Sequence, residues 1–289
     1  MRKGKITMFK TMLTAAGSLL LAGSLAAQIA VKSGDRIAFL GDSITAQGNS
    51  SQAGYVNLVM LGLKVNGIAA VKIPAGISGH KSNQMLARLK RDVLDKKPQI
   101  MTLSCGVNDV GHGKRGVELP DFKKNITAIV EQAQAAGIRV CILTATMNRE
   151  DPKHPHNIKL AGYNDFLRSL AKDKNCLLAD LNSDMQKIVA DFRKSSPKYK
   201  GNVLTVDGLH MNPDGNVMMA RGVLRALGLD NAQIAKAEAA WDNQKSGIGT
   251  VQLSVRDFRL LRSQAAAAGL TIQEYISRLV NREAEKMPK

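Results

Sequence analysis

Five short, continuously apolar runs recur along the chain up to residue 181, separated by longer stretches in which apolar residues return every three to four positions. Runs without polar alternation are typical of strands in a parallel sheet whose two faces are both covered by helices. We therefore predict five strands, at residues 37–40, 70–73, 100–104, 140–143 and 177–181.

The stretches between and after these runs have helical spacing. In residues 82–94, for example, Met85, Leu89 and Val93 fall on one face of a helix. The alternation of such stretches with the strands predicts an α/β fold: a three-layer α/β/α sandwich around a mainly parallel five-stranded sheet, with right-handed crossovers. The predicted helices are residues 55–64, 82–94, 121–136, 161–172, 184–192 and 213–227.

The segment at residues 1–26 does not fit this pattern. It begins with four basic residues and no acidic one, and continues as an uncharged run to Ala26. A basic start, a short apolar run and small residues at its end, here Ser24 and Ala26, are typical of a secretory signal peptide. We predict cleavage before Ala27 and a periplasmic or secreted protein. An uncleaved anchor is the alternative, although the run is short for a membrane span.

The chain changes character after Gly228, so we predict a main domain at residues 27–229 and a helical extension at residues 230–289. A polar helical segment is followed by a linker, KSGIGT, and then by a strand-like segment and two helical patterns. Thr271 and Glu274 fit a capping box between the two helices. This order resembles a ribbon-helix-helix DNA-binding unit, but a signal peptide argues against a role on DNA. We favour an accessory helical hairpin that packs on the main domain or on a second subunit.

The net charge is strongly positive and shapes the expected partners. The formal net charge is +17, and removal of the four basic residues of the leader leaves +13. In a cytoplasmic protein such a charge favours nucleic acid. In an exported protein, acidic polysaccharides or an anionic membrane surface are the expected counterparts, and solubility alone is the alternative. Aromatic residues make up only 4% of the chain, so few platforms for stacking bases or sugars are expected.

Three cysteines, Cys105, Cys141 and Cys176, each lie in or at the end of an apolar run. An odd number leaves at least one thiol unpaired, and the spacing matches no metal-binding pattern. We interpret them as buried thiols that pack as small apolar residues.

Four polar loops punctuated by glycine follow the predicted strands, at residues 41–43, 74–83, 105–109 and 206–215. In an open parallel sheet, loops at the carboxyl ends of the strands form the active crevice. Ordinary turns are the alternative, since glycine, asparagine and aspartate are common turn residues. A small polar residue after a strand, such as Ser43, is also a common helix cap.

The last of these loops favours catalysis. Asp207 and His210 are three residues apart, a spacing that lets a carboxylate reach one imidazole nitrogen while the other faces the crevice. A nucleophilic serine, here Ser43, needs a base that removes its proton and an acid that orients the base. Donors for an oxyanion are available in the backbone N–H groups of Ser43 and Gly79 and in the amide of Asn108. For Asn108, tying two loops together is the alternative role.

This set of residues resembles the SGNH hydrolases, also called GDSL esterases and lipases, over residues 34–228. The resemblance implies the flavodoxin-like fold of that family, a catalytic serine at Ser43 and no metal or organic cofactor. It also makes Asp42, Gly106 and Asp109 supporting residues. Four sequence blocks of the family are matched in order: GDSIT at residues 41–45; GISGHKS with Gly79 or, as the second candidate, Gly76; Gly-x-Asn-Asp at Gly106, Asn108 and Asp109; and Asp-x-x-His at Asp207 and His210.

Some positions depart from the pattern of the family. Ile44 stands where the family name has Leu, and His80 stands where relatives often have an acidic or amide residue. His80 can contact the leaving group or shift the local charge, and a polar role at the rim is the alternative. Ser43 also lacks the second glycine of a Gly-x-Ser-x-Gly elbow, which argues against an α/β-hydrolase.

His154 and His156, in the sequence DPKHPHN, form a further candidate pair. Two histidines can share a metal ion, but no third ligand is evident beside them, so we favour a surface lid and predict no metal site.

We predict an exported serine esterase that cleaves carboxylic esters through an acyl-enzyme, with acetyl groups on a polysaccharide as the favoured substrate. Lipid or lysophospholipid esters are the main alternative, and a non-catalytic carbohydrate-binding protein that uses the same crevice is another. The sequence leaves open the acyl-chain preference, the oligomeric state and the contacts of the extension.

Overall fold

The computed structural model describes residues 29–245 and 255–287. The predicted signal peptide, the linker KSGIGT after its first residue and the strand-like start of the segment that follows it lie outside the described residues.

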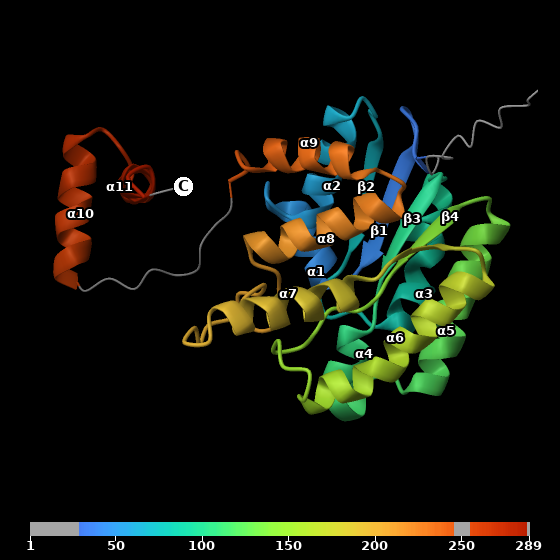
Figure 1. Ribbon diagram of the computed structural model, residues 1–289. Helices are drawn as coiled ribbons and strands as arrows, with labels where there is room; N and C mark the ends of the chain where they lie inside the picture. Colours follow the sequence, from blue (N-terminus) through green and yellow to red (C-terminus); the bar gives the residue numbers. More distant parts are fainter. Residues whose placement is uncertain (1–28, 246–254, 288–289) are drawn as a thin grey trace, which may run out of the picture.

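The sheet has five parallel strands in the order β2-β1-β3-β4-β5, which confirms the predicted fold class (Figure 1). Gly41 pairs with Gly76, and Leu40 pairs with Leu103, so β1, β2 and β3 end at one edge of the sheet. The strands are β1 (Arg36–Gly41), β2 (Val71–Gly76), β3 (Ile100–Ser104), β4 (Arg139–Leu143) and β5 (Leu177–Ala179).

Helices cover both faces of the sheet (Figure 1). Helices α2, α8 and α9 pack together on one face, whereas α3, α5 and α6 cover the other. Nine α-helices are described up to residue 245: α1 (Ser43–Ser50), α2 (Tyr55–Val65), α3 (Ser82–Asp92), α4 (Val107–Gly111), α5 (Leu119–Ala135), α6 (Pro155–Asp173), α7 (Leu181–Ser195), α8 (Pro213–Ala226) and α9 (Asn231–Trp241).

Three element boundaries differ from the prediction for local reasons. The predicted strand 177–181 ends at Ala179, because the Asp180 side chain accepts a hydrogen bond from Ser183 N–H and caps α7. Helix α6 begins at Pro155, before the predicted residue 161, because proline is favoured in the first turn. Strand β2 continues through Pro74 to Gly76, which is possible because β2 is an edge strand.

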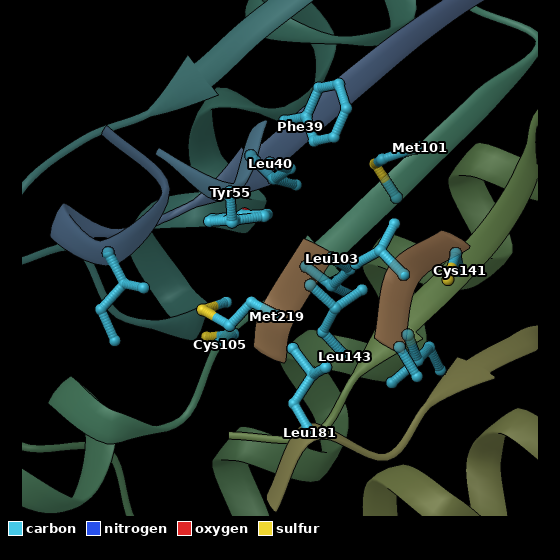
Figure 2. Packing of buried hydrophobic residues seen from close by; sticks show 14 of the residues in the cluster. Phe39, Leu40, Tyr55, Met101, Leu103, Cys105, Cys141, Leu143, Leu181 and Met219 are labelled. Carbon is cyan, nitrogen blue, oxygen red and sulfur yellow. The ribbon is translucent and has the colours of Figure 1, made fainter. Parts of the chain in front are cut away.

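The core lies on both sides of β1 and β3, whose apolar side chains are almost completely buried. Figure 2 shows Phe39 and Leu40 of β1 beside Tyr55 of α2, and Met101 and Leu103 of β3. The Phe39 and Tyr55 rings meet edge to face, with centroids 6.5 Å apart.

All three cysteines are unpaired, and an odd number had already required at least one free thiol. Cys105 and Cys141 are buried in the core, and Cys176 is half-buried. Burial raises the pKa of Cys141 to about 12, so the thiol is neutral and packs as a small apolar group.

Helix α9, the first part of the predicted extension, packs on α2. A Cβ atom on Gly62 of α2 would lie 3.1 Å from the Ala237 methyl group, and the indole N–H of Trp241 donates to the carbonyl of Leu58 at 2.9 Å. The remaining extension forms a helical hairpin of α10 (Val255–Ala267) and α11 (Ile272–Ala284).

The predicted capping box opens α11: Thr271 N–H donates to the carboxylate of Glu274, and Glu274 N–H donates to the Thr271 hydroxyl. Among the described residues, no helix combines the length and apolarity that a membrane span requires.

Candidate active site

Ser43 lies at the carboxyl end of β1, as the first residue of α1. The side chain of Asp42 accepts a hydrogen bond from Ile44 N–H at 2.9 Å and is the helix cap. Ser43 therefore opens α1, but the capping side chain considered for Ser43 belongs to Asp42, and the Ser43 hydroxyl is free for another contact. Helix α1 can start this close to the strand because Gly41 has no Cβ, which would lie 2.0 Å from the Thr45 hydroxyl.

The structure brings Ser43, His210 and Asp207 together. His210 Nε2 lies 2.9 Å from Ser43 Oγ, and His210 Nδ1 lies 2.6 Å from Asp207 Oδ2. The other carboxylate oxygen of Asp207 accepts the backbone N–H groups of Leu209 at 2.9 Å and His210 at 2.8 Å. These two bonds fix which oxygen faces the imidazole.

Asp207 is ionised at neutral pH. Burial alone raises its pKa, but hydrogen bonds from the His210 ring and from the His210 and Leu209 N–H groups outweigh this and hold the pKa below its usual value. A carboxylate at Nδ1 requires a proton on that nitrogen, so Nε2 of a neutral His210 carries a lone pair toward Ser43. This arrangement can remove the proton of the serine hydroxyl.

The geometry favours Gly79 over Gly76 as the glycine beside the site. Gly76 ends β2, and a Cβ on it would lie 2.5 Å from the Ala46 backbone nitrogen, so its role is close packing. Gly79 has φ +75°, a conformation that glycine adopts readily, and a Cβ there would have no atom within 4 Å. The space next to its backbone is open to a ligand.

Asn108 joins two of the predicted loops. Its side chain is 6% exposed, and its amide Nδ2 donates to the His80 carbonyl at 3.2 Å. The loop-tying role considered for Asn108 is therefore present. It holds the segment that contains Gly79 against α4, and one hydrogen of the amide remains for another acceptor. Helix α4 begins at Val107, and its N-cap residue, Gly106, has φ +135°.

Asp109 and Asp42 are buried carboxyl groups behind the site. Asp109 accepts the backbone N–H of Ser82 at 3.0 Å, the Ser82 hydroxyl at 2.6 Å and the Cys105 thiol at 3.4 Å. Burial raises the pKa of Asp109 against these bonds. Burial likewise raises the pKa of Asp42 to about 7, against the hydrogen bond from Ile44. Both carboxyl groups hold backbone in place around Ser43.

His80 is held by Arg88, a residue that the sequence analysis missed. Arg88 is 5% exposed, and its guanidinium donates to the carbonyls of Gly41 and Ala75, both at 2.8 Å, and to His80 Nδ1 at 3.1 Å. Burial and the adjacent Arg88 lower the pKa of His80. The sequence did offer one indication that Arg88 is buried, because it lies beside Leu89 on the apolar face of α3.

His154 and His156 form no visible metal centre. Their rings are in edge-to-face contact, with centroids 4.9 Å apart, and His154 Nδ1 accepts the His156 N–H at the start of α6. Within the described residues, no group of three or more His, Cys, Asp or Glu side chains is placed to hold a metal ion.

Comparison with known proteins shows which family the chain belongs to. A model of the GDSL-like lipase/acylhydrolase family matches residues 39–217. The chain is 22% identical over 219 residues to an acetylxylan esterase of Geobacillus stearothermophilus, a match that covers 69% of this chain and 97% of the relative. It is 31% identical over 129 residues to esterase TesA of Pseudomonas aeruginosa, and this match covers 44% of this chain and 63% of the relative.

Solved structures of two acetylxylan esterases have the same fold as this chain. A crystal structure of the acetyl xylan esterase AlAXEase is 32% identical, with a TM-score of 0.60 over 66% of this chain and 98% of that chain. The structure of the Geobacillus stearothermophilus acetylxylan esterase Axe2 is 21% identical, with a TM-score of 0.62 over 70% of this chain and 97% of that chain.

Proposed function

This chain is an ester hydrolase of the GDSL-like lipase/acylhydrolase family, and we propose that Ser43, His210 and Asp207 are its catalytic triad. The observation that carries the proposal is the unbroken series of contacts from Asp207 through both ring nitrogens of His210 to Ser43, at 2.6 and 2.9 Å.

The reaction proceeds in two steps. His210 Nε2 takes the proton of Ser43 as Oγ forms a bond to the ester carbonyl carbon, and the carbonyl electron pair moves to oxygen. When that pair returns, the alcohol leaves with the proton from His210, and the acyl group stays on Ser43. A water molecule, deprotonated by His210, then attacks the acyl-enzyme. The carboxylic acid leaves, and the proton returns from His210 to Ser43.

The oxyanion of each step needs donors placed before the reaction. We assign this role to the backbone N–H groups of Ser43 and Gly79 and to the second amide hydrogen of Asn108. The N–H of Ser43 lies in the first turn of α1, where backbone N–H groups have no partner within the helix. The open space at Gly79 and the bond from Asn108 to the next residue, His80, support placing all three donors around one point.

As substrate we propose acetyl esters on a polysaccharide. The support is the likeness to two acetylxylan esterases, one of them 32% identical. We further propose that residues 1–26 direct export and that the mature chain begins at Ala27. Its basic charge then suits an acidic polysaccharide or another anionic surface. Mass spectrometry of the exported protein tests the cleavage site, and an intact leader on exported protein would contradict it.

The test compares the release of acetate from a panel of acetylated polysaccharides with the hydrolysis of acetyl, butyryl and long fatty-acyl p-nitrophenyl esters. We expect acetate from acetylated xylan, and we expect Ser43→Ala to reduce every activity to background while the thermal unfolding midpoint stays unchanged. Activity in pure Ser43→Ala protein would refute the triad. Preference for long acyl chains would indicate lipid esters, and a wild-type protein that a fluorophosphonate probe does not label would indicate a binding protein.

A further inference from the structure

A buried carboxylate lies against the loop that carries Asp207 and His210. Glu150 is 4% exposed, and each of its carboxylate oxygens accepts hydrogen bonds. Oε2 accepts the backbone N–H of Val203 at 2.6 Å. Oε1 accepts the backbone N–H of Leu204 at 2.8 Å and the hydroxyl of Thr205 at 2.7 Å. Glu150 thus binds three consecutive residues just before the loop.

Thr205 passes this contact on to the residue that follows Asp207. Its hydroxyl donates to Glu150 and accepts the backbone N–H of Gly208 at 3.1 Å. The carbonyl of Gly208 in turn accepts the backbone N–H of Arg149 at 2.5 Å. Both backbone polar groups of Gly208 are therefore held: its N–H by Thr205, which is bound to Glu150, and its carbonyl by Arg149.

The segment that contains Arg149 and Glu150 is itself held by hydrogen bonds from α6. Arg149 and Glu150 have φ of 56° and 50°, a left-handed conformation that non-glycine residues adopt only when their surroundings enforce it. Asn157 of α6 supplies such surroundings. Its side chain donates to the carbonyls of Asn148 and Asp151, both at 2.6 Å, and accepts the Asn148 N–H at 2.8 Å.

From these contacts we propose that Glu150 and Thr205 are positioning residues that keep His210 within hydrogen-bond distance of Ser43. The proposal rests on the triad assigned above. Neither residue touches the reacting atoms. The Asp207 side chain is 51% exposed, so packing around it does little to hold it in place. The Thr205 hydroxyl holds the peptide unit that joins Asp207 to Gly208. A shift of about 1 Å in a catalytic group is enough to cost about 100-fold in rate.

The experiment replaces Thr205 with Val, which has the same shape but cannot bridge Glu150 and Gly208, and with Ser, which keeps the hydroxyl. The matched control is Thr102→Val in β3, because Thr102 is fully buried and its hydroxyl has no partner within the described part of the chain. The kcat and KM for p-nitrophenyl acetate and the thermal unfolding midpoint are measured for each protein, together with Ser43→Ala.

We expect Thr205→Val to lower kcat about 10- to 100-fold with KM within about threefold of wild type, because binding does not use this loop contact. Thr205→Ser is expected to recover most of kcat, and Thr102→Val to retain it. A kcat of Thr205→Val equal to that of Thr102→Val would overturn the proposal. So would a loss that Thr205→Ser shares in full, because that loss would not depend on the hydroxyl.

Glu150→Gln gives a second measurement that does not depend on the folding of Thr205→Val. Both carboxylate oxygens accept hydrogen bonds, so one donor must face the new amide NH2 group whichever way the side chain turns. A reduced kcat at unchanged KM supports the proposal, and wild-type kcat contradicts it. Ser43→Ala distinguishes failure of the positioning proposal from failure of the triad. If Ser43→Ala stays active, the assigned mechanism fails. If Ser43→Ala is inactive and Thr205→Val keeps the wild-type kcat, only the positioning proposal is refuted.

Discussion

Replacing Asp207 with Asn tests whether the carboxylate fixes the protonated nitrogen of His210. One oxygen of Asp207 accepts two backbone N–H groups, at 2.8 and 2.9 Å, and the other faces His210 Nδ1 at 2.6 Å. In Asp207→Asn the amide oxygen stays with the two N–H groups, so the NH2 group donates to Nδ1. The proton of His210 then lies on Nε2, which can no longer accept the proton of Ser43.

The size of the effect follows from these contacts. Turning the amide to restore the productive form sacrifices two backbone hydrogen bonds, roughly 1–3 kcal/mol in all. The developing imidazolium also loses a charge-assisted hydrogen bond worth about 1.5–3 kcal/mol, with the lower part of that range appropriate to a half-exposed carboxylate. The sum of roughly 2.5–6 kcal/mol corresponds to a loss of about 10²- to 10⁴-fold in kcat/KM.

The assay is hydrolysis of p-nitrophenyl acetate by wild type, Asp207→Asn, Asp207→Ala and, as a surface control, Asp191→Asn. Asp191 is 65% exposed and forms a surface ion pair with Lys187 at 2.6 Å, so its variant should keep full activity. In Asp207→Ala a water molecule can accept the Nδ1 proton, so Asp207→Asn should be at least as impaired. If Asp207→Asn retained more than a tenth of wild-type activity, or clearly exceeded Asp207→Ala, the tautomer argument would be wrong.

Two further predictions concern the surroundings of Ser43. Asn108→Ala should lower kcat about 10²- to 10³-fold, as removal of an oxyanion donor does, and a loss below tenfold in the ester assay would contradict the assignment. Asp42→Asn should keep the helix cap but change how stability depends on pH. Burial raises the pKa of Asp42 from 3.8 to about 7, so the folded state binds one more proton than the unfolded state between these values. Wild-type stability therefore falls as pH rises from 4 to 7, by about 1.4 kcal/mol for each pKa unit at most. Urea unfolding at several pH values should show a flatter slope for Asp42→Asn, and an unchanged slope would exclude Asp42 as the cause.

The sheet and the order of the site residues follow from the sequence because both depend on local patterns. Strands buried on both faces must be continuously apolar, and three of the predicted strands match the observed bounds within one residue at each end. The polar loops then follow at the carboxyl ends of the strands. Parallel pairing sets those ends side by side, so residues as far apart as Ser43 and His210 can meet.

The contacts that hold the site in place depend on the tertiary structure and left little trace in the sequence. Arg88 lies beside Leu89 on the apolar face of its helix, but nothing in the sequence indicates that its guanidinium reaches carbonyls near the ends of β1 and β2. Glu150 lies in a loop without a periodic pattern, and its partners come from a segment more than 50 residues further along the chain. Helix α4, at Val107–Gly111, has too few residues to show a helical period. The cap at Asp42 rather than Ser43 depends on the backbone angles at the end of β1.

The two edge strands, β2 and β5, are poorly suited to pairing with a strand of another chain. Pro74 removes a backbone donor from β2, and β5 has only three residues, so within residues 29–245 neither margin of the sheet offers a long row of free donors and acceptors. Short and proline-interrupted margins prevent strand addition, the step by which sheets join into larger sheets or aggregates. Edge-to-edge joining of two copies through these margins is therefore disfavoured.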